Sequence, residues 1–512
     1  MSRTTRLLHG VAFGYANQVL VTLVGIWLTA FLLGRLGQAD YGVWLVGTRI
    51  LGYLLLLDVG VVALLPREIA FATGRAGGAA VATDLAEIVG RTARIVLWQT
   101  PLVAIASLVI WVFLPTEWEP LRLPLAAVLV VFVLTFPARV FHGALSGLQD
   151  LAYLGATYTV TWLLGTGMTV GLVLAGWGLY ALAVGWAVSQ GLSSAIWWVR
   201  LRRAFPTALP HGLPAFSGAP LRERLGRGLW ISVAQVAQVL LQGTDLLIIG
   251  KLLGPNAVVP YFCTAKVLTV LANQPQLLAQ TAQPALSELR TSADRHRLRQ
   301  VCVALTRAIL VLSGGVVCLV LLVNQGFVVW WVGAAQYGGF WLTAVLAAGM
   351  LLRHWNMTTV YSLFALGHDK RISITTLVDG AVTVVASVLL TRAYGLLGAA
   401  LGTVAGVLMV GLPVNLRLLA KETAASVSRL ALELWPWAWR FVLGAAAALA
   451  ISRVWVPVTL PALVAATALC GIGYLGLMWP LALQEPLGQY VRPRLAALRR
   501  LTNRTVAGDA RR

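Results

Sequence analysis

The chain consists largely of long apolar segments separated by charged residues, glycine or proline. An apolar run of about 20 residues is long enough to cross the hydrocarbon core of a bilayer as a helix. The pattern therefore predicts an all-α polytopic membrane protein with about fourteen transmembrane helices. The predicted spans lie near residues 11–33, 42–64, 94–114, 122–146, 155–176, 178–200, 228–250, 257–283, 302–323, 339–366, 373–391, 394–416, 439–456 and 461–483.

Lysine and arginine are distributed unevenly between the two sides of these spans. With the amino terminus inside, the inward segments carry 31 of these cations and the outward ends carry five. Short cytoplasmic loops of membrane proteins are enriched in Lys and Arg. We therefore expect a multi-pass protein of the cell membrane (inner or plasma membrane) with both termini in the cytoplasm. The same bias explains most of the net charge of +21 without a nucleic-acid partner.

The composition excludes a water-soluble enzyme, because 59% of the residues are hydrophobic and only 11% are charged. Soluble domains are usually about 45–50% apolar and about 25% charged. The carboxylates expected outside are Asp40, Glu117 and Glu119, which form no pair suited to acid–base or metal chemistry. The four cysteines lie in apolar runs without the spacing of a metal or redox site. We expect no enzymatic activity, no disulfide, no metal and no cofactor.

A weak internal repeat divides the chain. At an offset of 217 residues, Arg49 aligns with Lys266, Leu36-Gly37 with Leu253-Gly254, and Gly178-Leu179 with Gly395-Leu396. Transporter folds are often built from two such halves. The repeat predicts an N-terminal six-helix bundle and a C-terminal six-helix bundle with appended elements. The predicted parts are the bundles 1–200 and 228–416, a cytoplasmic linker at 201–227, a cytoplasmic loop with two further helices at 417–483, and a basic cytoplasmic tail at 484–512.

Seven charged residues within the spans are the candidate functional groups. A charge at a helix centre costs about 2.5–3.5 kcal/mol on insertion scales, so it is a functional candidate by default. Asp58, two residues before Gly60, fits more simply a helix end near the cytoplasmic surface. The seven are Arg49, Asp58, Arg139, Asp245, Lys266, Arg353 and Asp379.

Several motifs resemble those of polysaccharide exporters of the Wzx type. These are GVAFGYANQVL at 10–20, the R-LG-x-x-x-YG turn at 35–42, LLDVG at 56–60, REIA at 67–70, GALSGLQD at 143–150 and PALSELR at 284–290. Such exporters belong to the MOP superfamily, together with multidrug and toxin extrusion (MATE) antiporters and the lipid II flippase. The resemblance implies two bundles facing each other across a cavity that opens alternately to the two sides.

The resemblance also implies a substrate and a function. The substrate is an oligosaccharide on undecaprenyl diphosphate, which a flippase moves from the cytoplasmic to the outer leaflet during surface polysaccharide biosynthesis. Membrane lipids and other polysaccharide-assembly proteins are the further expected partners.

A diphosphate in this cavity needs cations, and we expect Arg49, Lys266, Arg353 and Arg139 to supply them. In the lipid II flippase relatives, cavity arginines occur in helices 2 and 8, which resemble Arg49 and Lys266 in location. Asp245, Asp379 and Asp58 are expected to balance these charges or to bind a coupling ion. Snorkelling to the interface or internal salt bridges would also explain the cations.

Two other functions fit the sequence less well. A MATE-like cation-coupled antiporter of small molecules would favour a carboxylate in the first span, and residues 11–33 contain none. A scaffold within a polysaccharide-synthesis complex is the third alternative.

Overall fold

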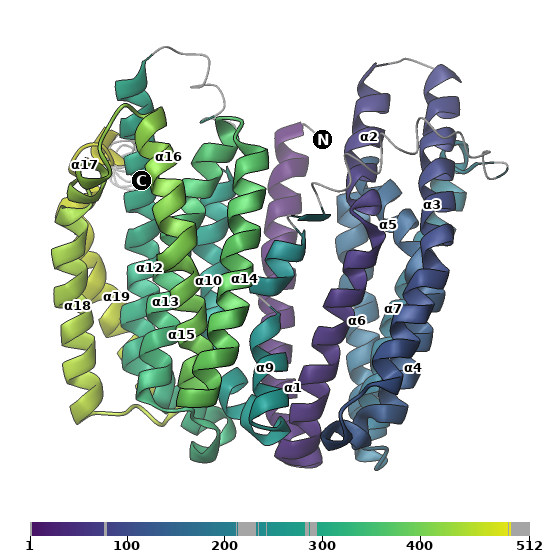
Figure 1. The fold of residues 1–512 in the computed structure, drawn as a ribbon, viewed down its shortest axis with the longest axis horizontal. Coiled ribbons are helices and arrows are strands. Elements are labelled where there is room, and N and C mark those ends of the chain that lie inside the picture. The colour runs from purple at the N-terminus through teal and green to yellow at the C-terminus, as the bar shows by residue number, and fades with distance from the viewer. Residues whose placement is uncertain are drawn as a thin grey trace, which may run out of the picture. The chain divides into compact units, whose positions relative to one another are not determined.

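A computed structural model gives the fold (Figure 1). It describes residues 3–75, 79–210, 212, 232–233, 235–241, 243–281, 286, 294–489 and 491–492. These described residues form helices and their connections, and none of them lies in a strand. The predicted all-α polytopic class is confirmed, and the chain is a multi-pass membrane protein.

The chain divides into two compact units, Met1–Val259 and Pro260–Arg512. The described part of 228–259 therefore packs with the first unit, although the repeat assigns this segment to the second bundle. The bundle boundaries expected from the repeat stay predictions.

The first unit begins with α1, η1 and α2, which include the first two predicted spans. Its helices are α1 (Arg3–Leu54), η1 (Leu55–Asp58), α2 (Val61–Arg75), α3 (Ala79–Val112), η2 (Thr116–Leu121), α4 (Arg122–Thr135), η3 (Phe136–Ala138), α5 (Arg139–Gly147), α6 (Leu151–Leu174), α7 (Leu179–Ala204), η4 (Pro206–Ala208) and α9 (Thr244–Leu252). The next helix, α10 (Pro255–Thr281), starts in this unit and continues into the second.

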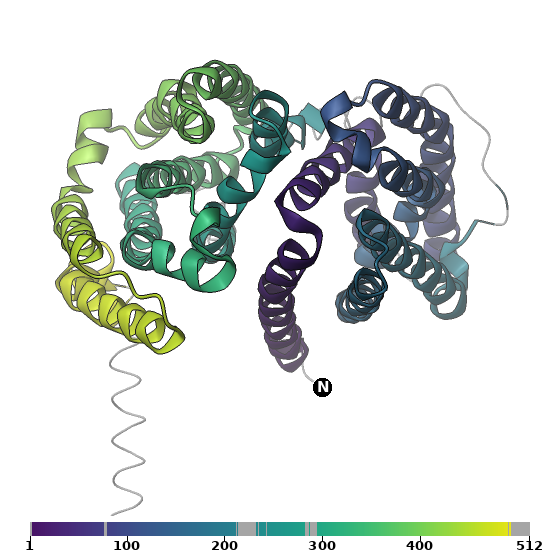
Figure 2. The same cartoon turned by 90° about the horizontal axis from the view of Figure 1, so that it is seen from below.

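Helix α1 contains two spans that meet at Gly37. The apolar segment 17–58 would be about 63 Å long as one straight helix, roughly twice the thickness of the hydrocarbon core. Gly37 has a φ of 83°, a conformation that glycine adopts without the steric cost of a side chain. The two arms of α1 meet at this bend (Figures 1 and 2).

The second unit packs around α12, which is its longest helix. Helices α13, α18 and α19 all contact α12, and Tyr474 of α19 donates a hydrogen bond to the carbonyl of Val311 on α12 at 2.8 Å. The helices are α12 (Arg295–Val332), η5 (Ala334–Gln336), α13 (Phe340–Ala365), α14 (Asp369–Tyr394), α15 (Leu396–Gly406), the π-helix η6 (Val407–Gly411), α16 (Leu412–Glu422), α17 (Val427–Leu432), α18 (Trp435–Val454) and α19 (Leu460–Ala482).

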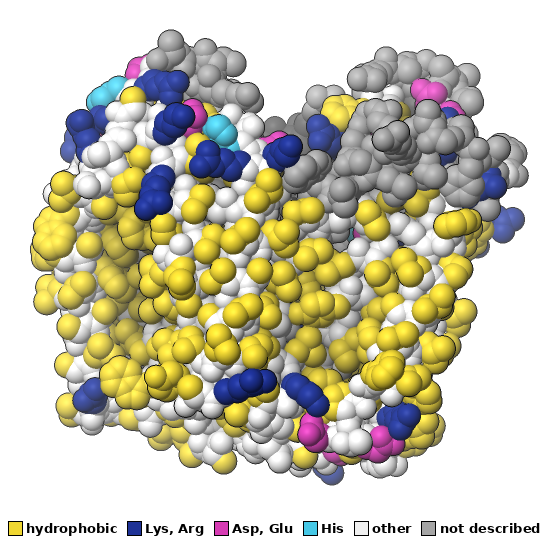
Figure 3. Space-filling view, viewed as in Figure 1, with side chains coloured by type: hydrophobic (Ala, Val, Ile, Leu, Met, Phe, Trp, Pro, Cys, Tyr) yellow, Lys and Arg dark blue, Asp and Glu magenta, His cyan; other side chains and the backbone are white. Residues whose placement is uncertain are grey.

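Eleven segments of the described chain are long and apolar enough to cross a membrane. The two arms of α1 count as one of these segments. The fourteen predicted spans correspond to these eleven segments when the arms of α1 are counted separately. The remaining two are α13 and the partly described segment 228–250. On the face shown in Figure 3, hydrophobic side chains cover the middle of the helices, and lysine and arginine side chains lie toward the helix ends.

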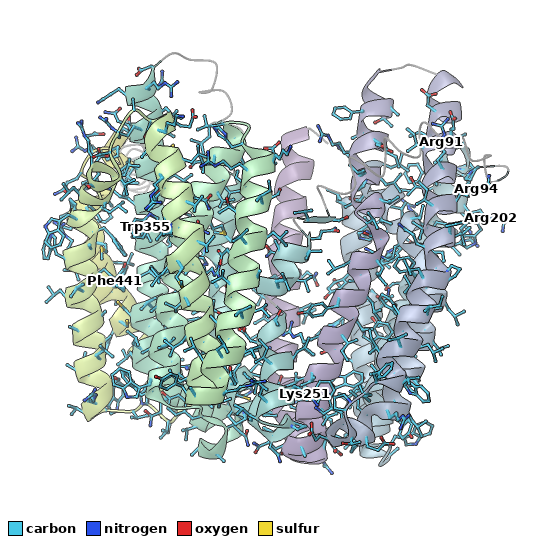
Figure 4. All side chains as sticks on the ribbon, viewed as in Figure 1. Arg91, Arg94, Arg202, Lys251, Trp355 and Phe441 are labelled. Carbon is cyan, nitrogen blue, oxygen red and sulfur yellow. The ribbon has the colours of Figure 1, made fainter. Side chains whose placement is uncertain are left out.

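The first unit separates cations expected on opposite sides of the membrane. Arg91, Arg94 and Arg202, which we expect in the cytoplasm, lie toward one end of its helices, and Lys251, which we expect outside, lies at the opposite end (Figure 4). These four residues thus lie at opposite ends of the unit, and the orientation of the unit in the membrane stays a prediction.

Cysteine labelling tests this orientation. In a variant whose four native cysteines are replaced by alanine, Arg202→Cys should be protected from an impermeant thiol reagent added to intact cells. Lys251→Cys should be labelled, because both side chains are exposed but on opposite sides. If Arg202→Cys is labelled in intact cells and Lys251→Cys is protected, the orientation in the membrane is the reverse of the one predicted here.

Candidate functional site

The seven candidate residues form three pairs of opposite charge, with Lys266 as the seventh. Each pair lies within one unit and joins residues that are far apart in the sequence. The pairs are Arg353 with Asp379, Arg139 with Asp58, and Arg49 with Asp245.

Arg353 on α13 is held by α14 and α15. Its Nη1 donates to Asp379 Oδ2 at 2.6 Å, and its Nη2 donates to Thr383 Oγ1 at 2.9 Å and to the carbonyl oxygen of Thr403 at 3.1 Å. The Asp379 side chain is 1% exposed, whereas the Arg353 side chain is 19% exposed. The guanidinium is thus almost fully engaged by the protein in this state.

Glycine residues and a π-helical turn allow the backbone to approach this carboxylate. A Cβ on Gly406 would lie 2.7 Å from Asp379 Oδ1, and a Cβ on Gly411 would lie 2.4 Å from Asp379 Oδ2. Gly411 ends the π-helix η6 (Val407–Gly411), and such turns are frequent at functional sites. Any larger residue at Gly406 or Gly411 would therefore clash with the Asp379 carboxylate.

Arg139 on α5 pairs with Asp58 at the end of η1. Arg139 Nη2 lies 2.9 Å from Asp58 Oδ2, and the Asp58 side chain is only 1% exposed. The pair lacks good hydrogen-bond alignment, because Asp58 Oδ2 and Arg139 Nη1 are buried without a hydrogen-bond partner among the described residues. Phe136 also contacts the guanidinium, whose carbon lies 5.3 Å from the ring centroid.

The backbone at Asp58 is strained. Asp58 Oδ1 accepts a hydrogen bond from the amide of Gly60 at 2.7 Å, and the side-chain amide of Gln99 donates to the Asp58 carbonyl at 3.0 Å. Between them, Val59 has a φ of 50°, which is unusual for a β-branched residue. The helix end expected at Asp58 is present, and its carboxylate is buried among the helices. The carboxylate is buried because it carries the helix break and receives Arg139.

Arg49 and Asp245 bring α1 and α9 together. Their opposite charges interact, and one turn further along α1 the hydroxyl groups of Tyr53 and Thr244 lie 2.6 Å apart in a hydrogen bond. Asp245 lies in the first turn of α9, where a carboxylate interacts favourably with the helix dipole. Asp245 therefore contributes a favourable negative charge to the surroundings of Arg49 within the first unit.

Lys266 lies in a different environment. Its Nζ lies 5.2 Å from the centroid of the Phe262 ring, one turn earlier on α10, in a cation–π contact. The side chain is partly buried. Lys266 and Arg49 belong to different compact units, and their meeting around one substrate stays a prediction.

Several polar partners of these charges were not predicted from the sequence. Thr383 lies four residues after Asp379, so it faces the same side of α14, and this spacing could have identified it. Gly406 faces Asp379 as well, eight residues after Gly398 in a series of glycines spaced by four that is typical of close helix packing. The carbonyl of Thr403 carries no sequence signal at all.

The sequence was compared with models of known protein families and with curated proteins. Residues 98–345 match the family model described as polysaccharide biosynthesis protein. No curated protein sequence matches the chain.

Solved structures share the fold. The lipid II flippase MurJ in an inward closed conformation aligns with a TM-score of 0.64 at 11% identity, covering 92% of this chain and 99% of that chain. An inward-facing multidrug resistance MATE family transporter of the MOP superfamily aligns with a TM-score of 0.57 at 16% identity, covering 80% and 96%. The chain therefore shares the fold of these two transporters.

A third solved transporter also shares the fold. A MOP superfamily transporter from Pyrococcus furiosus aligns with a TM-score of 0.52 at 16% identity, covering 82% of this chain and 95% of that chain. The match of residues 98–345 to a polysaccharide biosynthesis family model and the fold shared with these transporters agree with the resemblance noted in the sequence motifs.

Proposed function

We propose that this MOP-superfamily protein is a flippase that moves undecaprenyl-diphosphate-linked oligosaccharide from the cytoplasmic to the outer leaflet for surface polysaccharide biosynthesis. The family match over residues 98–345 and the fold shared with a lipid II flippase support transport over catalysis. The observation that carries the proposal is the pairing of two partly buried arginines within the spans, Arg353 and Arg139, with the almost fully buried carboxylates of Asp379 and Asp58.

Charge exchange is the mechanism that these pairs support. A diphosphate competes with a carboxylate for a guanidinium, because phosphate oxygens accept the same two parallel N–H bonds. While no substrate is bound, Asp379, Asp58 and Asp245 stabilise the arginines in a medium where an unpaired charge is costly. Arg353 retains a buried Nε without a hydrogen-bond partner among the described residues, and Arg139 retains its Nη1. Each guanidinium can therefore offer a further donor.

The carboxylates also fit a role in coupling. When the diphosphate takes the guanidinium, the displaced carboxylate is left buried, and binding a proton or a small cation would neutralise it. Asp379 is the best placed for this role because Thr383 also hydrogen-bonds it, with an O–O distance of 3.3 Å.

Deletion of the gene tests the proposed substrate class. Cells that lack the protein should lose the surface polysaccharide and accumulate the lipid-linked oligosaccharide in the cytoplasmic leaflet, and expression of the protein should reverse both effects. A MATE-like antiporter predicts the opposite pattern, with normal polysaccharide and altered resistance to toxic cations. That pattern would replace the flippase proposal.

A further inference from the structure

A pair of buried asparagines lies beside the Arg353–Asp379 ion pair, and the charge exchange described above does not use it. Asn356 on α13 is 9% exposed, and Asn415 on α16 is 2% exposed. The side-chain amide of Asn415 donates a hydrogen bond to Asn356 Oδ1 at 2.9 Å. Burial of an amide is costly unless its polar atoms find partners inside the protein. The surroundings of the two amides therefore indicate what they do.

The amide nitrogen of Asn356 faces the Asp379 carboxylate. Asn415 occupies the Asn356 Oδ1 end, so the planar amide directs its Nδ2 toward another neighbour. Gly411 marks that direction, because a Cβ on Gly411 would lie 2.8 Å from Asn356 Nδ2 and would clash with Asp379 Oδ2. Both atoms thus border the same small space, which stays open because residue 411 is a glycine.

The π-helical turn η6 creates this space. In an α-helix, with 3.6 residues per turn, residues five positions apart point in directions that differ by about 140°. In a π-helix, hydrogen bonds join residues five positions apart, so such residues lie one above the other. Gly406 precedes η6 and Gly411 ends it, and both face Asp379. Asn415 follows Gly411 by four residues, on the same face of α16. The turn therefore brings the carboxylate and the asparagine pair together.

Arg353 and Asn356 are two alternative donors for the same carboxylate. They are three residues apart on α13, so their side chains share one face of the helix. Arg353 Nη1 donates to Asp379 Oδ2 at 2.6 Å, and Thr383 donates to Asp379 Oδ1 at 3.3 Å. A carboxylate that leaves Arg353 would therefore meet the Asn356 amide without leaving Thr383.

We propose that Asn356 is a positioning residue, which receives the Asp379 carboxylate when Arg353 is engaged elsewhere. Asn415 orients the Asn356 amide for this role. The diphosphate of the substrate is what engages Arg353, and this part of the inference rests on the proposed function. The exchange keeps a carboxylate that is only 1% exposed hydrogen-bonded in both states, since a buried charge without partners is costly.

A double-mutant cycle on thermal unfolding tests the inference without any substrate. Arg353→Gln removes the cation, so Asp379 then depends on Asn356 and Thr383. In the purified full-length protein, Asn356→Leu should lower the Tm by about 3–6 °C more in the Arg353→Gln background than in the unmodified protein, because a hydrogen bond to a charged group is lost. The bond from Asn415 is lost in both backgrounds and cancels. Equal shifts in the two backgrounds would show a merely structural role and overturn the inference.

Asp379→Asn is the matched control for this cycle. It removes the charge that needs the amide, so the excess shift should disappear when Asp379→Asn is added to Arg353→Gln. An excess that persists there would contradict the inference. If Arg353→Gln is too unstable to purify, Arg353→Lys replaces it, since lysine lacks the fork that reaches Thr383 and Thr403. A smaller excess is then expected, and additive shifts would again overturn the inference.

Substrate binding connects Asn356 with transport. Asn356→Leu should weaken the binding of undecaprenyl-diphosphate-linked oligosaccharide about tenfold to a hundredfold, and by no more than about twofold when Asp379→Asn is also present. Asn324→Leu removes another buried amide of the same unit, which donates to Thr264 and Thr343, and should leave binding within about twofold.

The two measurements separate the inference from the proposed function. If the unmodified protein does not bind this substrate while the thermal cycle gives the expected excess, the proposed function fails and the positioning role of Asn356 stands. Equal weakening of binding by Asn356→Leu and Asn324→Leu would assign Asn356 to the scaffold and overturn the inference.

Discussion

Replacing Arg353 by glutamate should abolish transport of the lipid-linked oligosaccharide. The change removes the cation that binds Asp379 at 2.6 Å and places a second carboxylate beside a side chain that is 1% exposed. Removal of one partner from a buried ion pair typically costs about 3–5 kcal/mol, because the other charge is left uncompensated. Arg353→Lys should retain partial transport, since it keeps the charge but loses the planar fork that grips phosphate oxygens. Transport by proteoliposomes, normalised to the amount of folded protein, measures both effects.

A charge swap distinguishes the two roles of Arg353. If the residue serves only to pair with Asp379, the combination of Arg353→Glu with Asp379→Arg should restore transport. The flippase mechanism expects no restoration, because the cation would then sit on α14 instead of α13. Arg392→Ala is the matched control, since Arg392 is an exposed arginine at the far end of α14 and should behave as the unmodified protein. Full rescue by the swap would assign Arg353 to the scaffold.

Arg49→Ala and Lys266→Ala should each reduce polysaccharide export sharply while the protein still reaches the membrane. Both residues place a cation in a predicted span, and the sequence repeat relates them. Their surroundings differ, because Arg49 is balanced by Asp245 whereas Lys266 lies against Phe262. Surface polysaccharide per cell, at native expression levels, is the measurement.

The double variant of Arg49→Ala with Asp245→Asn decides what Arg49 does. It removes the cation and its counter-charge together, so any defect caused only by an unpaired carboxylate should disappear. A substrate-binding role predicts that export stays low in this variant. Recovery of normal export would show that Arg49 neutralises Asp245 and has no part in substrate binding.

Hydropathy predicted most of the helices, because a span requires a long apolar run whatever it packs against. It misplaced the ends of the second span, predicted at 42–64. The helix instead breaks at Asp58–Gly60, since Val59 and Gly60 both have positive φ and Asp58 caps the turn. Such a break depends on the contacts of Asp58 with Gln99 on α3 and Arg139 on α5. These residues are distant in the sequence, so the residues around Asp58 do not reveal them.

The site was predicted as a set of charges but not as pairs. A charge inside an apolar run is visible in the sequence, and all seven candidates were found in this way. Which acid meets which base depends on helix packing, and the partners are 26, 81 and 196 residues apart in the chain. The pair of Arg353 with Asp379 could be anticipated, since the two predicted spans are consecutive.

The pairing also changes the expected charge of the site. Four cations and three carboxylates leave a net charge of only one positive unit among the seven residues. Arg353 and Arg139 are each held in an ion pair within their own unit. On the proposed function, a diphosphate would gain their charge when the paired carboxylates are displaced or neutralised.

The most direct test of this account is a comparison of two substrates in proteoliposomes that contain the purified protein. One is a fluorescent oligosaccharide on undecaprenyl diphosphate, and the other is the same oligosaccharide on a polyprenol without phosphate. Access of a membrane-impermeant quencher measures movement between leaflets. The account predicts protein-dependent movement of the diphosphate-linked substrate and none of the neutral one. Equal movement of both substrates, or of neither, would contradict it.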